Sequence, residues 1–367
     1  MMRSMWTKRS LTAAGVAAAG ALVLSGCGQA PDEAPEAAGG EESVDYKACI
    51  VSDAGGWDDQ SFNQSGYEGL MAAVDEFGIE HAEAQSQSDA DFGPNVDSMV
   101  QQGCNVVFGV GFLLEEALHD AAEANPETDF ALIDSTFSDA DGNPAELENG
   151  KPLVFNTAEA AYLAGYVAAA MSETGTVATF GGMQIPSVTI FMDGFADGVD
   201  RYNEDNGEDV QLLGWNKESQ QGSFSGDFDN QSQGRTIAEQ FLSQDADVIM
   251  PVAGPVGLGA AAAIDEVDDA KLIWVDSDGY ESTEHGDIIL TSVLKQISQA
   301  VYDTVEEGVN DQFDATPYVG TLENEGVGLA PFHDFEDEVP QEVKDKVDEL
   351  RQEIISGETV VETENAP

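Results

Sequence analysis

The densest group of polar residues in this chain lies between Ser52 and Leu70, in the stretch SDAGGWDDQSFNQSGYEGL. It follows the apolar run KACIV, and it places three aspartates and an asparagine beside a glycine pair. Carboxylates in such a group can act as general acids or bases, hold a metal ion, or accept hydrogen bonds from a ligand. The neighbouring segments decide between these chemistries.

Further polar groups follow other apolar runs of the chain. They are Asp134 after FALI, the loop GPVGLG (254–259) after VIMPVA, Asp276 and Asp278 in LIWVDSD, and Lys295 at the end of ILTSVLK. Ligands of open α/β sheets bind at the carboxyl ends of the strands. A single aspartate there is as often a helix N-cap, and GPVGLG lacks the G-x-G-x-x-G spacing of dinucleotide sites. The coincidence of five segments, with Asp53 in the first, indicates a ligand site.

Two side chains in these segments suit a flat, oxygen-bearing ligand. Phe62 stands between Ser61 and Asn63, a polar context that favours a ring face offered to a ligand, although a core position also fits. Lys295 could donate a hydrogen bond to a ligand oxygen, or it could simply neutralise neighbouring acidic residues.

Catalysis is the less favoured alternative. The four histidines, His81, His119, His285 and His333, lie in no motif of a general acid or base, and no G-x-S-x-G occurs. Asp58 and Asp59 are adjacent, so their side chains point apart on most backbones, which disfavours a shared metal ion. We therefore expect no enzymatic activity, no cofactor and no metal.

The elements that position these residues alternate between strand and helix. Apolar runs such as ACIVSD, CNVVFGVG, DFALIDS, GTVATFGG and ADVIMPVAG are separated by stretches with a 3.6-residue period. Nearly continuous apolar strands indicate parallel sheets that are covered on both faces. The predicted fold class is α/β and doubly wound, and the length favours two Rossmann-like lobes.

The N-terminal residues have the features of a lipoprotein signal peptide. Basic residues (Arg3, Lys8 and Arg9) precede the apolar run LTAAGVAAAGALVL, and LSGC ends at Cys27. We expect a signal peptide over residues 1–26, a lipid on Cys27 that anchors the protein to the extracytoplasmic face of the cell membrane, and a flexible tether over 27–44. An ordinary signal peptide is the alternative, and residues 357–367 are expected to be a disordered tail.

The charge is strongly acidic, with 71 Asp and Glu against 13 Lys and Arg. Loss of the three basic residues of the signal peptide would leave 10 basic residues and a net charge of −61. Nucleic acid and anionic membrane surfaces are poor partners for this charge, so we expect no binding of nucleic acid, and adaptation to high salt is our hypothesis. Cys49 and Cys104 could form a disulfide in an oxidising compartment, but two free buried thiols are favoured.

The order of the motifs resembles the basic membrane protein family. These are lipoproteins of the purine nucleoside receptor type, the solute-binding subunits of nucleoside ABC transporters. The shared motifs are DAGGWDDQSFNQSGYEG, FALIDS, NTAEAAYLAGYVAA, FMDGFADGV, ADVIMPVAGPVGLG, WVDSD and LTSVLK, and the resemblance spans about residues 46 to 335.

The resemblance implies a type I periplasmic-binding-protein fold, in which two lobes close on a ligand. Three crossovers would join the lobes near residues 155–158, 295–298 and 316–319. Lobe 1 would then comprise residues 45–156 and 297–316, and lobe 2 residues 157–296 and 317–356. We expect a monomer that delivers its ligand to an ABC permease.

The resemblance also implies a role for each matching residue. Asp53 would bind the purine edge with the help of Asn63, and Phe62 would stack on the base. Asp134 and Asp276 would accept hydrogen bonds from ribose hydroxyls. The remaining residues are Gly257, which would offer backbone, and Lys295, which would donate to the sugar or base. The chain has no phosphate cradle rich in Arg or Lys, which favours nucleosides such as guanosine, adenosine and inosine over nucleotides.

One departure from the family concerns the second face of the base. Relatives place a second aromatic ring in the loop that here reads GPVGLG, and Pro255 is not aromatic. Phe191, Trp215, or Pro255 together with Val256 could supply that face. Two rival functions remain. One is a calcium-dependent nucleoside hydrolase, because SDAGGWDD superficially resembles the aspartate cluster of those enzymes. The other is a nucleoside-sensing surface lipoprotein.

Overall fold

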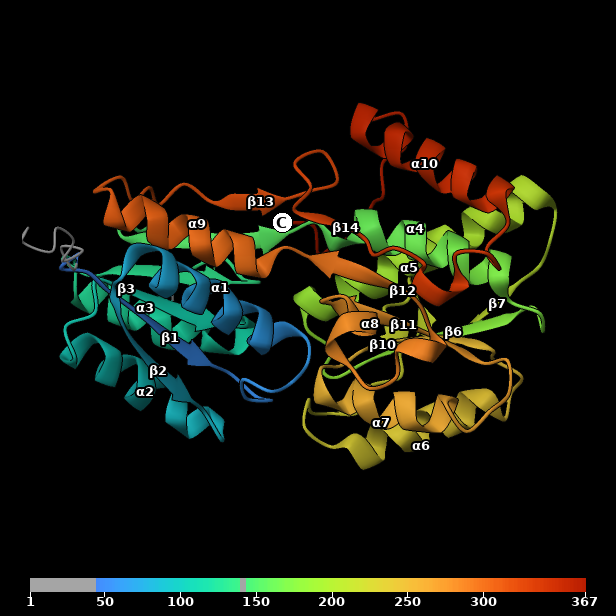
Figure 1. Ribbon diagram of the computed structural model, residues 1–367, viewed down its shortest axis with the longest axis horizontal. Coiled ribbons are helices and arrows are strands. Elements are labelled where there is room, and N and C mark those ends of the chain that lie inside the picture. The colour runs from blue at the N-terminus through green and yellow to red at the C-terminus, as the bar shows by residue number, and fades with distance from the viewer. Residues whose placement is uncertain (1–43, 139–142) are drawn as a thin grey trace, which may run out of the picture. The chain divides into compact units, whose positions relative to one another are not determined.

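The alternating strands and helices form two six-stranded sheets, each with helices on both faces (Figure 1). The computed structural model describes residues 44–138 and 143–367. The predicted signal peptide, Cys27 and almost all of the tether lie outside these residues. Within them, no helix is long and apolar enough to cross a bilayer.

The first sheet belongs to lobe 1 and is entirely parallel. Its strand order is β13-β5-β4-β3-β1-β2. The strands are β1 (Lys47–Ser52), β2 (Glu80–Gln85), β3 (Val106–Val110), β4 (Asp129–Ile133), β5 (Gly150–Phe155) and β13 (Tyr318–Gly320). Helices α1 (Phe62–Phe77) and α9 (Ile297–Val309) cover one face, and α2 (Asp89–Gln101) and α3 (Glu115–Ala124) cover the other.

The second sheet belongs to lobe 2 and has one antiparallel edge strand, β14. Its order is β14-β12-β11-β10-β6-β7. The strands are β6 (Thr176–Gly181), β7 (Gln211–Leu213), β10 (Val248–Val252), β11 (Lys271–Asp276), β12 (Ile289–Lys295) and β14 (Val327–Leu329), and a hairpin is formed by β8 (Trp215–Asn216) and β9 (Gln221–Gly222).

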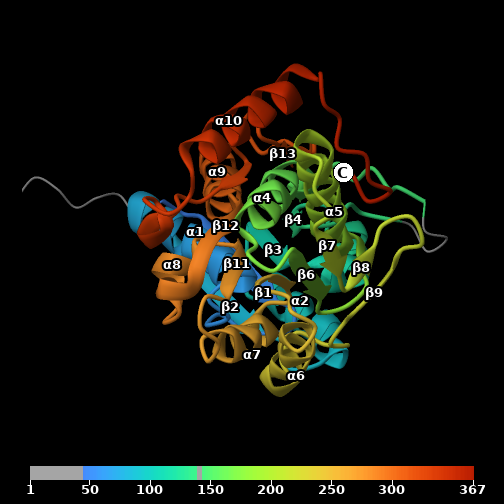
Figure 2. The same cartoon turned by 90° about the vertical axis from the view of Figure 1, so that its right-hand side faces the viewer.

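Two layers of helices cover this second sheet, as Figures 1 and 2 show from two sides. Helices α4 (Thr157–Met171) and α5 (Pro186–Asn206) lie on one face, with α10 (Gln341–Ser356) packed against α4. Helices α6 (Gln231–Leu242) and α7 (Pro255–Ile264) lie on the other face. Shorter helices are η1 (Phe112–Leu114), α8 (Gly279–Ser282), η2 (Gly286–Ile288) and η3 (His333–Phe335).

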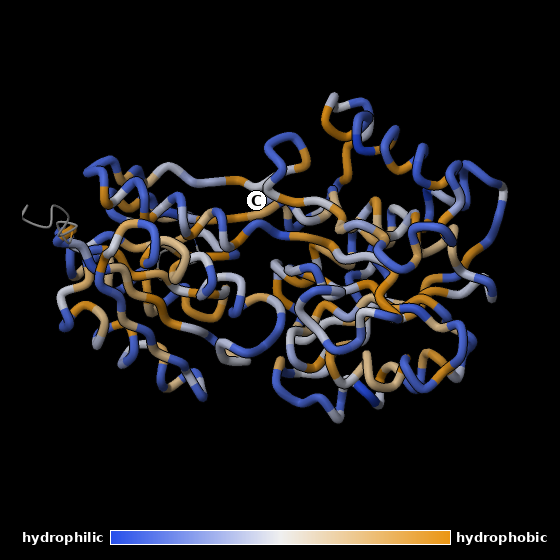
Figure 3. The backbone as a smooth tube through the Cα atoms, in the orientation of Figure 1, coloured by the Kyte–Doolittle hydropathy of each residue, from blue (hydrophilic) through white to orange (hydrophobic). Residues whose placement is uncertain are grey.

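The hydrophobic pattern explains why the sheets form where they do. The central strands β1, β3, β4, β10 and β11 are buried along almost their whole length, as continuous apolar runs require in a sheet covered on both faces. Hydrophobic residues accordingly follow the strands, and hydrophilic residues follow the outer helices (Figure 3). The predicted α/β class with two doubly wound lobes is confirmed.

Three crossovers join the lobes. The chain leaves lobe 1 between β5 and α4, returns between β12 and α9, and leaves again between β13 and β14. The third crossover lies later than the predicted boundary at 316/317. The reason is that Tyr318–Gly320 pairs in parallel with Leu153–Phe155 and therefore extends the sheet of lobe 1.

Two further expectations are corrected by the structure. Cys49 and Cys104 form a disulfide, with their Cα atoms 6.0 Å apart, instead of two free thiols. The segment 357–367 is packed against lobe 2 instead of being disordered. In that segment Val361 is buried, and the Thr363 hydroxyl donates to Asp193 on α5 at 2.6 Å.

Candidate functional site

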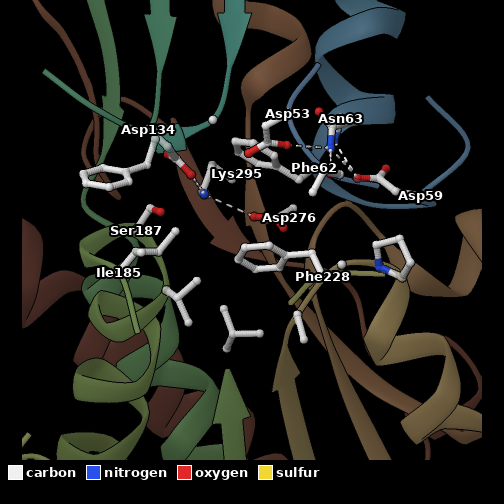
Figure 4. A pocket seen from close by; sticks show the side chains of 18 of the residues that line it. Asp53, Asp59, Phe62, Asn63, Asp134, Ile185, Ser187, Phe228, Asp276 and Lys295 are labelled. Atoms are coloured by element: carbon white, nitrogen blue, oxygen red, sulfur yellow. Dashed lines mark hydrogen bonds and ion pairs between the residues drawn. The ribbon is translucent and has the colours of Figure 1, made fainter. Parts of the chain in front are cut away.

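A cavity lies between the lobes, at the carboxyl ends of both sheets (Figure 4). Its lining from lobe 1 is Asp53, Ala54, Asp59, Phe62, Asn63, Gly111, Phe112 and Asp134. Its lining from lobe 2 is Ile185, Ser187, Val188, Phe191, Phe228, Val252, Ala253, Gly254, Pro255, Asp276 and Lys295. A ligand held there would contact both lobes.

Six of the seven predicted ligand-binding residues line this cavity: Asp53, Phe62, Asn63, Asp134, Asp276 and Lys295. Gly257 does not, because GPVGLG is the start of helix α7 and not an open loop. The N–H of Gly257 bonds to the Gly254 carbonyl at 2.8 Å, and a Cβ there would lie 3.1 Å from Trp274. Of the residues in GPVGLG, those that line the cavity are Gly254 and Pro255.

Asp59 is bound to the start of helix α1. Its Oδ1 accepts hydrogen bonds from the backbone N–H groups of Ser61 and Gln64, both at 3.0 Å, and its Oδ2 accepts from the N–H of Asn63 at 2.8 Å. These donors have no partner within the helix, so the carboxylate satisfies the first turn as a capping residue does. Asp59 therefore orients α1 and the two cavity residues that begin it, Phe62 and Asn63.

Asn63 holds Asp53 in place. Its Nδ2 donates to Asp53 Oδ1 at 3.2 Å, to the Ala54 carbonyl at 2.9 Å and to Asp59 Oδ2 at 3.3 Å. Asn63 Oδ1 is buried without a hydrogen-bond partner among residues 44–138 and 143–367. A buried polar atom in a cavity wall is a candidate acceptor for a ligand donor, because leaving it unpaired is costly.

Asp53 is the most strongly perturbed acid of the site. Burial raises the pKa of its carboxyl well above the usual value, the hydrogen bond from Asn63 opposes this, and the charges of Asp59, Asp134 and Asp229 raise it further. The carboxylate packs against Gly111, where a Cβ would lie only 2.0 Å from Asp53 Oδ2. With its φ of 112°, Gly111 can be replaced by no other residue without displacing Asp53.

Lys295 connects one aspartate from each lobe. Its Nζ lies 2.5 Å from Asp134 Oδ2 and 3.2 Å from Asp276 Oδ1. Lys295 and Asp276 are buried, and the Asp134 side chain is only 7% exposed. Burial lowers the pKa of the Lys295 ammonium, but the two carboxylates outweigh burial and raise it. Burial raises the pKa of Asp134, and the Lys295 charge only partly offsets that effect.

Both of these aspartates have unusual backbone conformations at the ends of their strands. Asp134 has a φ of 64° and Asp276 a φ of 70°, in the left-handed region that non-glycine residues seldom adopt. Aspartate tolerates this region better than most residues, and strained backbone is characteristic of binding sites. The paired conformations turn a carboxylate from each sheet toward the same lysine.

Aromatic rings surround the lysine and face the cavity. The Lys295 Nζ lies 5.0 Å from the ring centre of Phe62 and 4.9 Å from that of Phe191, within the range of cation–π attraction. The Phe62 ring lies on one side of the cavity and the Phe228 ring on the other (Figure 4). Two flat faces on opposite lobes suit a planar ligand.

Phe228 was not predicted from the sequence. It belongs to the segment before α6, where no strand end or helix pattern draws attention to it, although its DFDN context is as polar as the SFN context of Phe62. Trp215, one alternative for the second ring, is buried elsewhere, with its Nε1 donating to Asp193 at 3.0 Å. Phe191 does line the cavity, with its ring centre 4.9 Å from the Lys295 Nζ.

Comparisons with known proteins agree with this geometry. Residues 47–365 match the family Bmp, described as "ABC transporter substrate-binding protein PnrA-like". The ABC transporter nucleoside-binding protein BmpA of Lactococcus lactis is 32% identical, over 96% of this chain and 99% of that protein. Basic membrane protein A of Borreliella burgdorferi is 28% identical, over 86% and 87%.

The fold also has solved counterparts. A crystal structure of an ABC transporter solute-binding protein from Aeropyrum pernix K1 is similar with a TM-score of 0.76 and 28% identity, covering 85% of this chain and 92% of that one. A solute-binding protein from Conexibacter woesei has a TM-score of 0.64 at 20% identity, a likeness of fold alone. From the match over residues 47–365, this chain belongs to the Bmp family of PnrA-like ABC transporter substrate-binding proteins.

Proposed function

We propose that this protein is a lipid-anchored receptor, on the extracytoplasmic face of the cell membrane, that captures purine nucleosides between its lobes and delivers them to an ABC permease. The observation that carries the proposal is the cavity itself. It combines two opposed phenylalanine rings with buried carboxylates from both lobes and a single lysine. A relative named as a nucleoside-binding protein covers nearly the whole chain.

Each part of a nucleoside has a matching wall in this arrangement. The base would stack between Phe62 and Phe228, which gives the ring faces contacts from both lobes. Asp53 would accept hydrogen bonds from the base edge. Asp134 and Asp276, held by Lys295, would accept from the ribose hydroxyls, because a carboxylate offers two oxygens as acceptors.

The charge of the cavity favours nucleosides over nucleotides. Four carboxylates, those of Asp53, Asp59, Asp134 and Asp276, face it, against one ammonium group. A phosphate would meet carboxylate repulsion with no arginine fork to bind it. The lipid on Cys27 and the monomeric state belong to this proposal as well.

A hydrolase is the second candidate, and its difficulty is the state of the acidic residues. The carboxylate of Asp59 is occupied by the first turn of α1, and the carboxylates of Asp134 and Asp276 are paired with Lys295. A hydrolase needs one of these groups free to bind calcium or to activate water. None of the three is free in this arrangement.

A thermal-unfolding series tests the proposed ligand class. A ligand that binds only the folded state stabilises it by about 2.7 kcal/mol at a hundred times its Kd. We expect guanosine, inosine and adenosine to raise the Tm, and uridine, free ribose and guanosine 5′-monophosphate to leave it nearly unchanged. Chromatography of the same samples should recover the nucleosides intact. Stabilisation by ribose alone, or release of free base, would overturn the proposal.

Transport and sensing need a separate assay. If the protein delivers nucleosides to a permease, cells without it should lose the uptake of labelled guanosine at low concentration. Unchanged uptake together with binding by the purified protein would favour the sensing lipoprotein.

A further inference from the structure

The two lobes also meet beside the cavity, just before helix α1. The backbone carbonyl of Gln60 in lobe 1 accepts hydrogen bonds from three side chains of lobe 2. These donors are Trp274 Nε1 at 3.2 Å, Ser277 Oγ at 3.0 Å and Ser282 Oγ at 3.0 Å. A carbonyl oxygen has two lone pairs, so three convergent donors make this an unusually well-satisfied acceptor.

The backbone is specially shaped at this point. Gln60 has a φ of 57°, in the left-handed region that disfavours residues with a Cβ. Such conformations persist where the surrounding structure holds them. Here the surroundings include the capping carboxylate of Asp59 on one side and the three donors of lobe 2 on the other.

The next residue connects this contact to the cavity. The Ser61 hydroxyl is buried, and it lies 3.0 Å from Asp276 Oδ2 and 3.1 Å from the Val275 carbonyl. The other oxygen of Asp276 faces Lys295 at 3.2 Å. One carboxylate of lobe 2 is thereby held from lobe 1 on one side and by the lysine of the cavity on the other.

We propose that these residues form an interlobe latch, made of Gln60 and Ser61 in lobe 1 and of Trp274, Ser277 and Ser282 in lobe 2, that favours the closed state and slows ligand release. Every donor to the Gln60 carbonyl belongs to lobe 2, so separation of the lobes must break all three bonds. None of the five residues is among those that line the cavity. The latch residues therefore act on closure without contacting the ligand themselves.

The effect on ligand affinity follows from the populations of the two states. A ligand that contacts both lobes binds the closed state, and its apparent affinity falls in proportion to the closed fraction. Weakening the latch lowers that fraction and speeds opening of the loaded receptor. The ligand in this inference is the purine nucleoside of the proposed function. The kinetic test of the latch rests on that proposed function, whereas the scattering test does not.

The test is a double variant, Ser277→Ala with Ser282→Ala, that removes two donors without touching the cavity. The matched control is Ser243→Ala with Ser356→Ala, which removes two serine hydroxyls that donate to backbone carbonyls within lobe 2, those of Gln240 and Glu353. Stopped-flow mixing with guanosine gives the rates, and small-angle X-ray scattering of the ligand-free protein gives its radius of gyration.

For the latch variant we expect about tenfold faster guanosine dissociation, as the loss of two ordinary hydrogen bonds implies. We also expect association within about twofold of wild type and a larger ligand-free radius of gyration, with wild-type values for the control. Equal dissociation rates in the latch variant and the control would overturn the proposal.

Two other outcomes are equally decisive. If wild type binds no purine nucleoside, the proposed function fails and the scattering alone judges the latch: an unchanged radius of gyration in the latch variant would reject it. If the double variant does not fold, the single variants Ser277→Ala and Ser282→Ala take its place, each with a smaller expected change in the same direction. Wild-type rates and radius in both would again reject it.

Discussion

At the scale of single residues, the site is a set of buried charges that constrain one another. Lys295 has a carboxylate from each lobe within 3.2 Å, while Asp53 has an amide, Asn63, as its hydrogen-bond partner. The two ends of the cavity therefore differ in chemistry. The Lys295 end is a fixed ion cluster, and the Asp53 end is an acid whose protonation can change.

The state of Asp53 predicts how base preference depends on pH. An ionised carboxylate accepts from the N1–H and 2-amino groups of guanine, whereas a protonated one can donate to N1 of adenine and accept from its 6-amino group. Because burial raises the pKa of Asp53, its carboxyl takes up a proton at a higher pH than an ordinary aspartate does, and its protonated fraction grows as the pH falls. The ratio of adenosine to guanosine affinity should rise accordingly.

Calorimetry of both nucleosides at pH 5, 6 and 7.5 measures this ratio. The charged groups that act on Asp53 are Asp59, Asp134 and Asp229, and none of these three is expected to distinguish the two bases. An Asp53→Asn variant provides the control and should lose the pH dependence of the ratio. A ratio that is constant with pH in the wild type would contradict the assignment of Asp53 to the base edge.

A variant at Asp134 tests how much the ion cluster around Lys295 contributes to ligand affinity. Replacement by alanine leaves the Lys295 ammonium with one carboxylate instead of two, and it removes an acceptor from the proposed ribose site. We expect guanosine binding to weaken by about 2–3 kcal/mol, since a buried group left unpaired costs about 1–3 kcal/mol. Calorimetric titration of guanosine into this variant, and into the control variant Asp97→Ala at an exposed position, measures the loss of affinity. Wild-type affinity in Asp134→Ala would rule out the ribose assignment.

At the scale of helices and strands, the apolar pattern predicts the buried elements and not the edges. The central strands are continuous apolar runs and are recognisable as such. The polar residues that end or follow β1, β4, β11 and β12 include four cavity residues, Asp53, Asp134, Asp276 and Lys295. Strand β2, EHAEAQ, is an exposed edge strand and lacks that pattern. Strand β13 has only three residues, which is too short to be recognised from its sequence. Because β13 pairs with β5, the third crossover lies after the predicted boundary at 316/317.

The errors at the site have physical reasons as well. GPVGLG contains three glycines, which predict a loop, yet Pro255 at the first helical position begins α7. Gly257 lies inside this helix, where a Cβ would come within 3.1 Å of Trp274. Phe228 reaches the cavity from a segment without regular structure. Its position depends on tertiary packing against Gly182, where a Cβ would come within 2.3 Å of the ring. No local pattern encodes such a contact.

The disulfide yields a prediction at this scale. It ties Cys49 on β1 to Cys104 just before β3, across 55 residues of lobe 1, and neither cysteine lines the cavity. Removing a disulfide of this kind costs about 2–5 kcal/mol of unfolding free energy.

The variant Cys49→Ala with Cys104→Ala should therefore show a lower denaturation midpoint while keeping its guanosine affinity. Denaturant titration followed by calorimetry checks both values. A stability equal to that of the oxidised wild type would show that the disulfide contributes nothing to lobe 1.

At the scale of the whole molecule, the excess of acidic residues is the dominant feature. With 71 acidic and 13 basic residues, most carboxylates have no basic partner and repel one another. Salt screens repulsion between exposed charges, with a Debye length of about 10 Å at 0.1 M and about 3 Å at 1 M. Our hypothesis of adaptation to high salt follows from this balance.

The hypothesis predicts that the Tm rises steeply between 0.1 M and 2 M KCl. Sucrose, which favours compact states without screening charge, is the control for a general solvent effect. A Tm that does not change with KCl, or that rises equally with sucrose, would contradict a stabilising role for charge screening.

The central claim is that the cavity between the lobes binds purine nucleosides, and its most direct test is one calorimetric titration. Guanosine is added at high salt to the chain beginning after Cys27, and to the same chain with Phe62→Ala and Phe228→Ala. We predict one site per chain in the wild type and a loss of at least tenfold in affinity in the variant, because both faces of the base lose their stacking partner. No heat of binding in the wild type, or equal affinity in the two proteins, would contradict the claim.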